Sequence, residues 1–289
     1  MRELLYERLL QKGFEVMKNI RLLALDLDGT ALRSDNTLSK NVKCAIERAA
    51  DSGITVVAAS GRPYGAMPAE ILNMPAVSFF IASNGAAVHD RSGAKIYSRL
   101  LKEHDVTAIL ELTEAYDLIW EAFSEGETCT DSRYYNNPEG YGCSKAYVDY
   151  VRSSRGCSDN MRQYIYDNRK SLDSVEFVCT DETLRSRLRN EIESTLNGVY
   201  VTSSSRNFVE FMDGSATKAN ALRFICERMG VSPRNTAAAG NADNDVDMIK
   251  FSGFGAAVKN ACGACKEAAD VVVGSNDNDG IAEFIDSII

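Results

Sequence analysis

The stretch RLLALDLDGTALRS, residues 21–34, indicates the fold most clearly. It contains an apolar run that ends in two acids. Residues 22–25 are all apolar, which is typical of a strand covered on both faces of a sheet. Asp26 and Asp28 follow one residue apart, and Gly29 then permits a tight turn. Because side chains two residues apart in a strand point the same way, we expect both carboxylates to face a common point.

Two carboxylates that close together repel each other, and two kinds of chemistry would explain the pair. A hard cation such as Mg²⁺ binds oxygen ligands, often one or two carboxylates completed by water and a substrate phosphate. Alternatively, one carboxylate is a nucleophile beside a carboxylic acid that transfers a proton. An Asp-x-Asp-Gly motif also occurs in plain turns, so its meaning depends on the rest of the chain.

Composition bounds the size and class of the protein. With 289 residues, 45% of them hydrophobic, the chain can bury one large core and a second, smaller one. It carries 41 acidic and 32 basic residues, a net charge of -9, without a long basic run. This balance argues against a nucleic-acid surface and favours small-molecule chemistry.

Cysteine usage and the lengths of the apolar runs bear on location. The eight cysteines are scattered, which is typical of reduced thiols in a cytoplasmic protein. Cys262 and Cys265 have ligand-like spacing, but a single such pair without a nearby histidine favours a structural role. No apolar run approaches the roughly 18 residues of a spanning helix, and residues 1–16 lack the apolar region of a signal peptide. We therefore expect a cytoplasmic protein without a membrane partner, in which residues 1–16 form an accessory segment.

Short apolar runs alternate with helical patterns in the first and last parts of the chain, which is typical of βαβ units. In the first part we predict strands and helices in this order: strand 21–26, a helix from Ser39 as N-cap to a stop at Gly53, strand 54–59, a helix from Pro63, and strand 77–82. In the last part we predict a helix closed by Gly230 and strands 236–239, 254–258 and 269–273. The sequence therefore predicts an α/β fold with a Rossmann-like, three-layer core around a parallel sheet.

The middle of the chain lacks this repeated strand-turn-helix pattern. We predict strands 118–123, 174–179, 199–203 and 207–212, with helices around 106–113 and 184–192. Because the α/β pattern continues on both sides, this α+β domain is inserted rather than appended. We expect core segments at 17–87 and 214–289, an inserted domain at 88–213, and hinges near 87–89 and 212–215.

Polar residues follow three of the predicted parallel strands. Asp26 and Asp28 end the first strand, Ser60 follows the second, and residues 241–245 follow the strand at 236–239. Each group alone has a plain structural explanation, such as a helix cap or an acidic helix start. Together they lie at the carboxyl edge of an open α/β sheet, where ligands bind.

The chain resembles a known family at these positions. Four motifs, in this order, are similar to those of the haloacid dehalogenase-like phosphatases: Asp26-Leu27-Asp28-Gly29-Thr30, Ser60-Gly61-Arg62, Lys218, and Gly240-Asn241-Ala242-Asp243-Asn244-Asp245. Residues 83–86 (SNGA), residues 275–285 (SNDNDGIAEFI) and the place of the insert narrow the resemblance to the Cof-type branch, which inserts an α/β cap there. The resemblance covers the chain from about Met17 to its end.

The resemblance implies an aspartyl-phosphate mechanism. Asp26 would be the nucleophile, and Asp28 would protonate the leaving alcohol and later deprotonate water. Lys218 would pair with the phosphate and with Asp26 as a mobile point charge. Histidine chemistry is not expected, since neither His89 nor His104 lies near a motif.

The same resemblance implies the ligands of a metal ion and of the phosphate. Mg²⁺ would be held by Asp26, by the backbone carbonyl of Asp28 and by the fourth motif through Asn241 and Asp245.

The phosphoryl group would be bound by Ser60 and Asn244, together with Gly61 and Arg62 of the second motif. The family usually carries Gly-Asp where this chain has Gly240-Asn241, so a neutral amide stands where a carboxylate ligand is usual.

The sequence therefore predicts a Mg²⁺-dependent phosphatase of small phosphorylated metabolites, sugar phosphates first. A phosphomutase with the same intermediate remains an alternative, as does a catalytically weak phosphate-binding or regulatory protein, which the amide at Asn241 would suit. The cap would control water and read the leaving group. Its stretch from Tyr134 to Tyr150 carries aromatic and amide side chains that suit sugar faces, although these tyrosines would equally pack inside the cap.

Overall fold

The computed structural model describes residues 19–203 and 206–289. Residues 1–16, predicted as an accessory segment, lie outside the described residues, as do the first two residues of the predicted core, 17 and 18. No helix in the described ranges is both long and apolar enough to cross a membrane.

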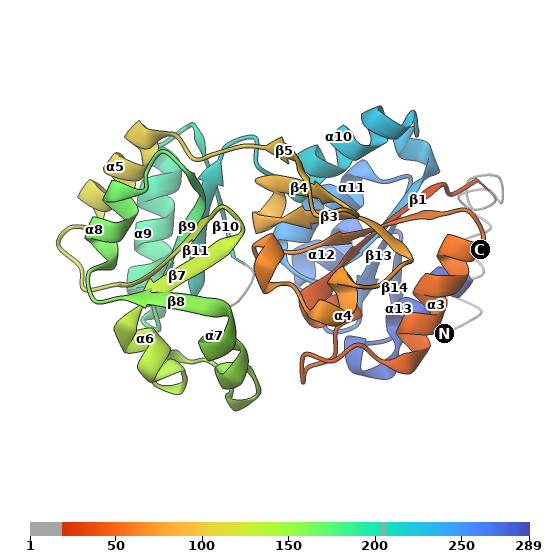
Figure 1. The fold of residues 1–289 in the computed structure, drawn as a ribbon, viewed down its shortest axis with the longest axis horizontal. Helices are drawn as coiled ribbons and strands as arrows, with labels where there is room; N and C mark the ends of the chain where they lie inside the picture. The colour runs from red at the N-terminus through yellow and green to blue at the C-terminus, as the bar shows by residue number, and fades with distance from the viewer. Residues whose placement is uncertain (1–18, 204–205) are drawn as a thin grey trace.

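The larger sheet has eight strands in the order β14-β13-β12-β1-β2-β3-β4-β5 (Figure 1). All neighbours from β14 to β3 pair in parallel, and β4 and β5 extend the sheet as an antiparallel hairpin. The strands are β1 (Leu22–Asp26), β2 (Thr55–Ala59), β3 (Val77–Ala82), β4 (Ala87–Asp90), β5 (Lys95–Ser98), β12 (Thr236–Gly240), β13 (Phe254–Val258) and β14 (Val271–Val273). The core is thus the predicted three-layer α/β fold.

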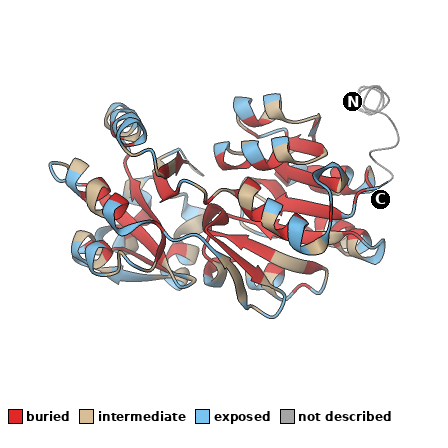
Figure 2. Cartoon of the chain, turned by 90° about the horizontal axis from the view of Figure 1, so that it is seen from above, coloured by how far each residue is buried: buried red, intermediate tan, exposed pale blue. Residues whose placement is uncertain are grey.

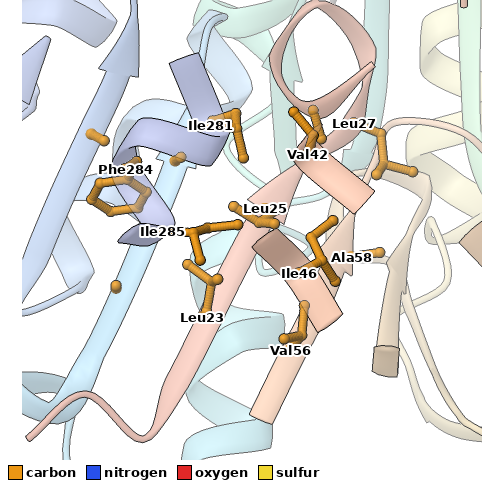
Figure 3. Packing of buried hydrophobic residues seen from close by; sticks show 14 of the residues in the cluster. Leu23, Leu25, Leu27, Val42, Ile46, Val56, Ala58, Ile281, Phe284 and Ile285 are labelled. Atoms are coloured by element: carbon orange, nitrogen blue, oxygen red, sulfur yellow. The ribbon is translucent and has the colours of Figure 1, made fainter. Parts of the chain in front are cut away.

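Helices cover both faces of this sheet. They are α3 (Lys40–Asp51), α4 (Ala69–Leu72), α10 (Lys218–Met229), α11 (Val246–Phe251), α12 (Gly263–Ala268) and α13 (Gly280–Asp286). On one face, α3 and α13 pack side by side, with Ile46 and Phe284 among the residues buried against Leu23 and Leu25 of β1 (Figure 3). On the other face, Leu222 of α10 and other apolar residues pack against the alternate side chains of β1, β2 and β12. Every residue of β1 is buried, as its unbroken apolar run predicts.

Local signals set the ends of two core helices as predicted. The hydroxyl of Ser39 accepts a hydrogen bond from the backbone N–H of Val42 at 3.1 Å, and α3 begins at the next residue, Lys40. Gly230 closes α10 in the left-handed conformation with φ of 63°. Both ends follow from side-chain or backbone chemistry within a few residues.

The long helix predicted from Pro63 does not form. Residues 64–66 make a single 3₁₀ turn, and α4 is only four residues long. Met67 and Pro68 between them are extended, with ψ of 148° and 133°. Proline disfavours helical backbone in the residue before it, so Pro68 breaks the helix at Met67.

The second sheet belongs to the inserted cap and has six strands in the order β10-β11-β9-β6-β7-β8. All pairs are antiparallel except β7 with β8. The strands are β6 (Ile119–Ser124), β7 (Glu127–Asp131), β8 (Arg155–Ser158), β9 (Leu172–Val178), β10 (Val199–Thr202) and β11 (Phe208–Asp213). The helices are α5 (Glu103–Leu112), α6 (Ser132–Asn136), α7 (Val148–Ser154), α8 (Met161–Asp167) and α9 (Glu182–Thr195).

The predicted start of the insert at residue 88 requires correction. Residues 87–98 form β4 and β5, which belong to the core sheet, so the chain leaves that sheet only after Ser98. The first hinge expected near 87–89 therefore lies inside a paired strand. The short hairpin escaped prediction because no helix follows it.

The chain passes between core and cap twice, and the two crossings lie close to each other. Lys102, on the outward crossing, is 3.6 Å from Asp213, on the return crossing. Next to this pair, the backbone N–H of Gly214 donates to the carbonyl of Gly198 at 2.6 Å. From here on, the cap denotes residues 99–213.

The two faces of the cap sheet differ. Helices α5, α8 and α9 bury one face in an apolar cluster that includes Trp120 and Phe177. Figure 1 shows the two sheets side by side, with α5 and α8 on the outer side of the cap. The other face of the cap sheet borders a cavity that residues of the core also line. Figure 2 shows that both sheets are largely buried and that the exposed residues gather on helices and loops.

Candidate active site

The candidate site lies at the carboxyl edge of the core sheet, where three neighbouring strands end. Asp26 is the last residue of β1, Ser60 follows β2, and Asn241 follows β12. Because β1 pairs in parallel with both other strands, these three positions are adjacent. The predicted convergence of the motifs on one edge is confirmed.

The turn after β1 brings the first motif against the fourth. Residues 27–31 make one wide turn, in which Asp28 and Gly29 are non-helical, and a 2.8 Å hydrogen bond from the N–H of Leu32 to the carbonyl of Leu27 closes it. Gly29 has φ of 75°, and a Cβ there would lie 2.6 Å from the side-chain nitrogen of Asn241. The hydroxyl of Thr30 donates to Asn241 Oδ1 at 3.2 Å. The left-handed backbone of the turn requires glycine, and a Cβ there would also displace the side chain of Asn241.

Lys218 joins two buried carboxylates. It is the first residue of α10, its side chain is inaccessible to solvent, and its Nζ lies 2.7 Å from both Asp26 Oδ1 and Asp245 Oδ1. Burial favours the neutral amine, but the carboxylates of Asp245 and Asp26 outweigh it and raise the pKa of Lys218. The lysine is therefore a fixed cation beneath the site.

Asp26 retains one oxygen for chemistry. Its Oδ2 is buried and has no hydrogen-bond partner among the described residues. Burial, and then the nearby carboxylate of Asp245, raise the pKa of Asp26 to about 7, although Lys218 acts in the opposite direction. A cation beside Oδ2 would favour the ionised form that a nucleophile needs.

Asp245 uses both of its oxygens within the protein. Oδ1 accepts from Lys218, and Oδ2 accepts from the backbone N–H groups of Asn241 and Ala242 at 2.9 and 3.0 Å. At Gly240 a Cβ would lie 2.3 Å from that of Asp245, so only glycine fits there. Although Asp245 was predicted as a metal ligand, the structure uses its carboxylate to hold Lys218 and the loop that carries Asn241.

Asp28 is held by the second motif. Arg62 donates to both of its oxygens, with Nε at 2.9 Å from Oδ2, and Ser60 Oγ donates to Oδ2 at 3.3 Å. The guanidinium also donates to Asn36 at 2.6 Å and lies 4.1 Å above the ring of Tyr150. Arg62, predicted to bind the phosphate, thus already has a carboxylate partner.

Asn244 lies in a chain of amides that leads into the cap. Its Nδ2 donates to Asn84 Oδ1 at 2.7 Å, and Asn84 Nδ2 in turn donates to Glu210 on β11. Asn244 Oδ1 is buried without a hydrogen-bond partner in the described part of the chain. A Cβ at Gly61 would lie 3.1 Å from Asn84 Oδ1, so the glycine leaves room for this amide.

A cavity of about 430 Å³ lies between the core and the cap. Its lining includes these predicted residues from the core: Asp26, Asp28, Gly61, Arg62, Asn241 and Asn244. Ser60, Lys218 and Asp245 contact this lining through the hydrogen bonds described above. The structure therefore brings all nine predicted residues together.

The aromatic stretch of the cap lies partly inside the cap and partly along the cavity. Tyr147 and Tyr150 line the cavity. Tyr134, although it also borders the cavity, is buried against Tyr141 and Phe208. The packing of Tyr134 inside the cap is confirmed, and the contact of these side chains with a sugar stays a prediction.

The donor set suits one hard cation without a dedicated cage. No group of three or more histidine, cysteine or acidic side chains is arranged to bind a metal in residues 19–203 and 206–289. The carboxylate of Asp26, the amide oxygen of Asn241 and the carbonyl of Asp28 are nevertheless the kinds of oxygen donor that Mg²⁺ binds. The residues fit an ion whose remaining ligands are water and a substrate phosphate.

Several residues of the site were missed from the sequence. They are Thr30, Asn36, Asn84 and Arg155, and three glutamates of the cap sheet, Glu121, Glu176 and Glu210. The glutamates had a visible signal, because each interrupts an apolar strand: IWEAF, SVEFV and FVEFM. Such lone acids in apolar strands indicate a strand face that is not packed in the apolar core.

Comparison with known proteins defines the class to which this fold and site belong. A family profile described as haloacid dehalogenase-like hydrolase matches residues 23–285. A Bacillus subtilis protein named 5-amino-6-(5-phospho-D-ribitylamino)uracil phosphatase YwtE is 25% identical, with 93% of this chain and 98% of the relative covered.

Solved structures agree with this class. A haloacid dehalogenase-like hydrolase from Bacteroides thetaiotaomicron is 26% identical with a TM-score of 0.76, covering 93% of this chain and all of that one. Another from B. subtilis, at 24% identity and the same coverage, shares the fold with a TM-score of 0.80.

The chain belongs to the haloacid dehalogenase-like hydrolases, as the resemblance of its motifs predicted. Within the family it is a Cof-type phosphatase, with the α/β cap inserted between the second and third motifs. It is therefore a phosphoric monoester hydrolase.

Proposed function

We propose that the protein is a Mg²⁺-dependent phosphatase of small phosphorylated metabolites, with sugar phosphates first, and that it acts through an aspartyl-phosphate. The observation that supports this most is the state of Asp26. One of its oxygens is fixed by Lys218 at 2.7 Å, the other is buried and unpartnered within the described residues, and Asp26 is among the residues that line the cavity. An oriented, desolvated carboxylate of this kind is suited to nucleophilic attack on phosphorus.

The side chains divide the reaction between them. Asp26 forms the bond to phosphorus while the leaving oxygen departs in line. Asp28 donates a proton to that oxygen and later removes one from the water that attacks the aspartyl-phosphate. The Arg62 and Ser60 hydrogen bonds hold the Asp28 carboxyl group in place for both transfers.

Charge at the phosphoryl group is balanced by fixed groups. Lys218 offsets one of the two negative charges that Asp26 and Asp245 carry beneath the site. In this proposal the second N–H of Asn244 Nδ2 donates to the transferring oxygens, and so does the Ser60 hydroxyl when it turns from Asp28 to the substrate. When bound by Asp26, Asn241 and the Asp28 carbonyl, Mg²⁺ would offset negative charge on the phosphoryl oxygens. The amide at Asn241 gives such an ion less charge than the usual carboxylate.

The cap closes the site from above. The carbonyl of Gly126 in the cap accepts from the N–H of Gly65 in the core at 3.1 Å, and Lys95 in the core pairs with buried Asp173 in the cap at 3.6 Å. With the Asn84 bond to Glu210, these contacts cover the reacting atoms and limit water.

Phosphate release tests the proposal. Sugar, polyol and nucleotide monophosphates would be assayed with Mg²⁺ and with EDTA, and the products analysed for a phosphate moved to another hydroxyl. Free phosphate that depends on Mg²⁺ supports a phosphatase, whereas an isomeric phosphate ester identifies a mutase. No turnover of any substrate would overturn the proposal and favour a binding protein.

The intermediate can be tested directly. Asp28→Asn would slow hydrolysis of the aspartyl-phosphate, so that borohydride added during turnover would reduce residue 26 to homoserine. Peptide mass analysis would locate this change. Asp243→Asn, at an acid that does not line the cavity, is the matched control that should not accumulate the intermediate.

A further inference from the structure

Arg62 is the group that holds Asp28 in the candidate site. Its guanidinium donates to both oxygens of Asp28, and Nε lies 2.9 Å from Oδ2. The side chain of Asp28 is 35% exposed, whereas that of Arg62 is 7% exposed. A carboxyl group as accessible as this can turn towards solvent, so its position depends on how firmly Arg62 is fixed.

The core supplies Arg62 with two further acceptors. Asn36 Oδ1 accepts from its Nη2 at 2.6 Å, and the carbonyl of Ala66 accepts from its Nη1 at 3.4 Å. Hydrogen bonds to a guanidinium lie near its plane, because all five N–H bonds point outward in that plane. They leave the flat faces of the group to other contacts.

The cap supplies such a contact through Tyr150. The central carbon of the Arg62 guanidinium lies 4.1 Å from the centre of the Tyr150 ring. A cation within about 6 Å of a ring centre is attracted by the ring, most strongly where water is excluded. Burial raises the pKa of Tyr150, although Arg62 and Arg155 act in the opposite direction, so the ring is a neutral phenol. The contact is therefore one between a cation and a ring rather than an ion pair.

The cap also holds the ring of Tyr150 in place. Arg155 lies 5.1 Å from the centre of this ring, and hydrogen bonds of 3.0 and 3.2 Å tie the arginine to buried Glu121. The ring of Tyr147 meets that of Tyr150 edge to face, with centres 6.2 Å apart. Val151, the next residue of α7, is buried inside the cap. A chain of contacts thus runs from the cap sheet to the active site.

We propose that Tyr150 is a positioning residue, which fixes Arg62 and thereby keeps Asp28 in place for its proton transfers. This rests on the proposed phosphatase function. Because the ring belongs to the cap and the carboxyl group to the core, acid–base catalysis is complete only while the cap covers the site. The cap thus takes part in the chemistry as well as limiting water.

Loss of the ring should affect those substrates whose leaving oxygen needs a proton. An alcohol leaves poorly unless it is protonated, whereas 4-nitrophenol leaves readily as an anion. 4-Nitrobenzyl phosphate and 4-nitrophenyl phosphate form a matched pair, since they carry the same ring and differ by one methylene group. Their kcat/KM covers the steps up to departure of the leaving group, so the later hydrolysis of the aspartyl-phosphate does not enter the comparison.

Tyr150→Leu removes the ring and keeps an apolar side chain. We expect kcat/KM to fall roughly tenfold for 4-nitrobenzyl phosphate, which is part of the roughly 100-fold or more that a general acid contributes. For 4-nitrophenyl phosphate the fall should be less than about threefold. Tyr150→Phe keeps the ring, and both of its values should stay within about threefold of wild type.

The ratio of the two kcat/KM values does not depend on the fraction of enzyme that is folded, so a partly unfolded variant still gives an answer. Tyr150→Met, with an unbranched and adaptable side chain, takes the place of Tyr150→Leu if that variant yields no folded protein.

Tyr166→Leu is the control variant. Arg169 lies 4.2 Å from the centre of the Tyr166 ring, so the same kind of contact is removed elsewhere in the cap. Tyr166 is 44% exposed and is not among the residues that line the cavity. For both substrates, kcat/KM should stay at the wild-type value.

The outcomes separate this inference from the function on which it rests. A fall at least as large for 4-nitrophenyl phosphate would show that Tyr150 only shapes the cavity, and no fall for either substrate would show that Arg62 needs no ring. A fall in Tyr150→Phe as large as in Tyr150→Leu would assign the effect to the hydroxyl group. Each of these results overturns the inference and leaves the phosphatase standing. No phosphate release from either substrate by the wild-type protein would refute the phosphatase function, and the inference with it.

Discussion

Lys218→Met tests whether one buried cation holds the active site together. The substitution keeps most of the length and apolar stem of the side chain and removes the ammonium group. In the wild type this group is inaccessible and lies 2.7 Å from two carboxylates. Without it, Asp26 and Asp245 face each other in a site from which water is largely excluded.

The expected loss follows from this geometry. Removing one partner of a buried ion pair leaves an uncompensated charge and costs about 3–5 kcal/mol. The full cost applies here because Lys218 is only 1% exposed and because Asp245 cannot turn to solvent while it also binds two backbone N–H groups. We therefore expect the free energy of unfolding to fall by about 3–5 kcal/mol and kcat to fall by roughly 100-fold or more.

Urea unfolding followed by circular dichroism measures the loss, with Lys250→Met on α11 as the control. Lys250 is exposed, so its variant should change stability by less than about 0.5 kcal/mol. The double variant Lys218→Met, Asp245→Asn removes one of the stranded charges and should recover part of the stability. A loss in Lys218→Met no larger than in the control would refute the role given to the buried ion pairs.

Three further predictions concern the chemistry and Glu176, a buried acid of the cap sheet. Asp26→Asn removes the nucleophile and should lower the rate of phosphate release by several powers of ten with an unchanged circular dichroism spectrum; a rate within about tenfold of wild type would exclude it as nucleophile. Asn241→Asp adds a negative charge beside the proposed ion and should lower the half-saturating Mg²⁺ concentration in rate assays, whereas an unchanged or higher value would show that Asn241 is not a ligand. Glu176 has a folded-state pKa above the ordinary 4.5, so its stabilising protonated form is lost as the pH rises from about 4.5 through the folded-state pKa. Glu176→Gln should therefore gain stability relative to wild type as the pH rises above about 4.5, by up to about 1.4 kcal/mol per pH unit, and a constant difference would contradict the raised pKa.

Sequence reasoning worked where the signal is local. Ser39 and Gly230 end their helices through contacts within a few residues, and the apolar run before Asp26 specifies a strand buried on both faces. The site was predictable for a related reason, because parallel strands bring their carboxyl ends to one edge whatever the details of the helices.

What escaped prediction depends on contacts between distant segments. The pairing of β4 with β3 and β5 is set by sheet extension, which leaves no periodic pattern in a four-residue strand. The partner of Arg62 could not be inferred either, since the ion pair with Asp28 depends on how two loops meet. The alignment of Glu121, Glu176 and Glu210 across the cap sheet depends on the register of β6, β9 and β11, and these acids are 34 to 89 positions apart in the sequence.

The closeness of the two crossings has a consequence for how such a protein can change. Because Lys102 and Asp213 are 3.6 Å apart, the whole cap enters and leaves the core at nearly one point. A different cap could be exchanged there as a cassette, since the core needs only two neighbouring attachment points. The groups proposed to break the phosphate ester all belong to the core. Asn84 and Arg62, also in the core, contact the cap through Glu210 and Tyr150. Substrate preference and phosphoryl chemistry can thus be inherited, recombined and engineered as separate parts, provided that a new cap brings a partner for Arg62.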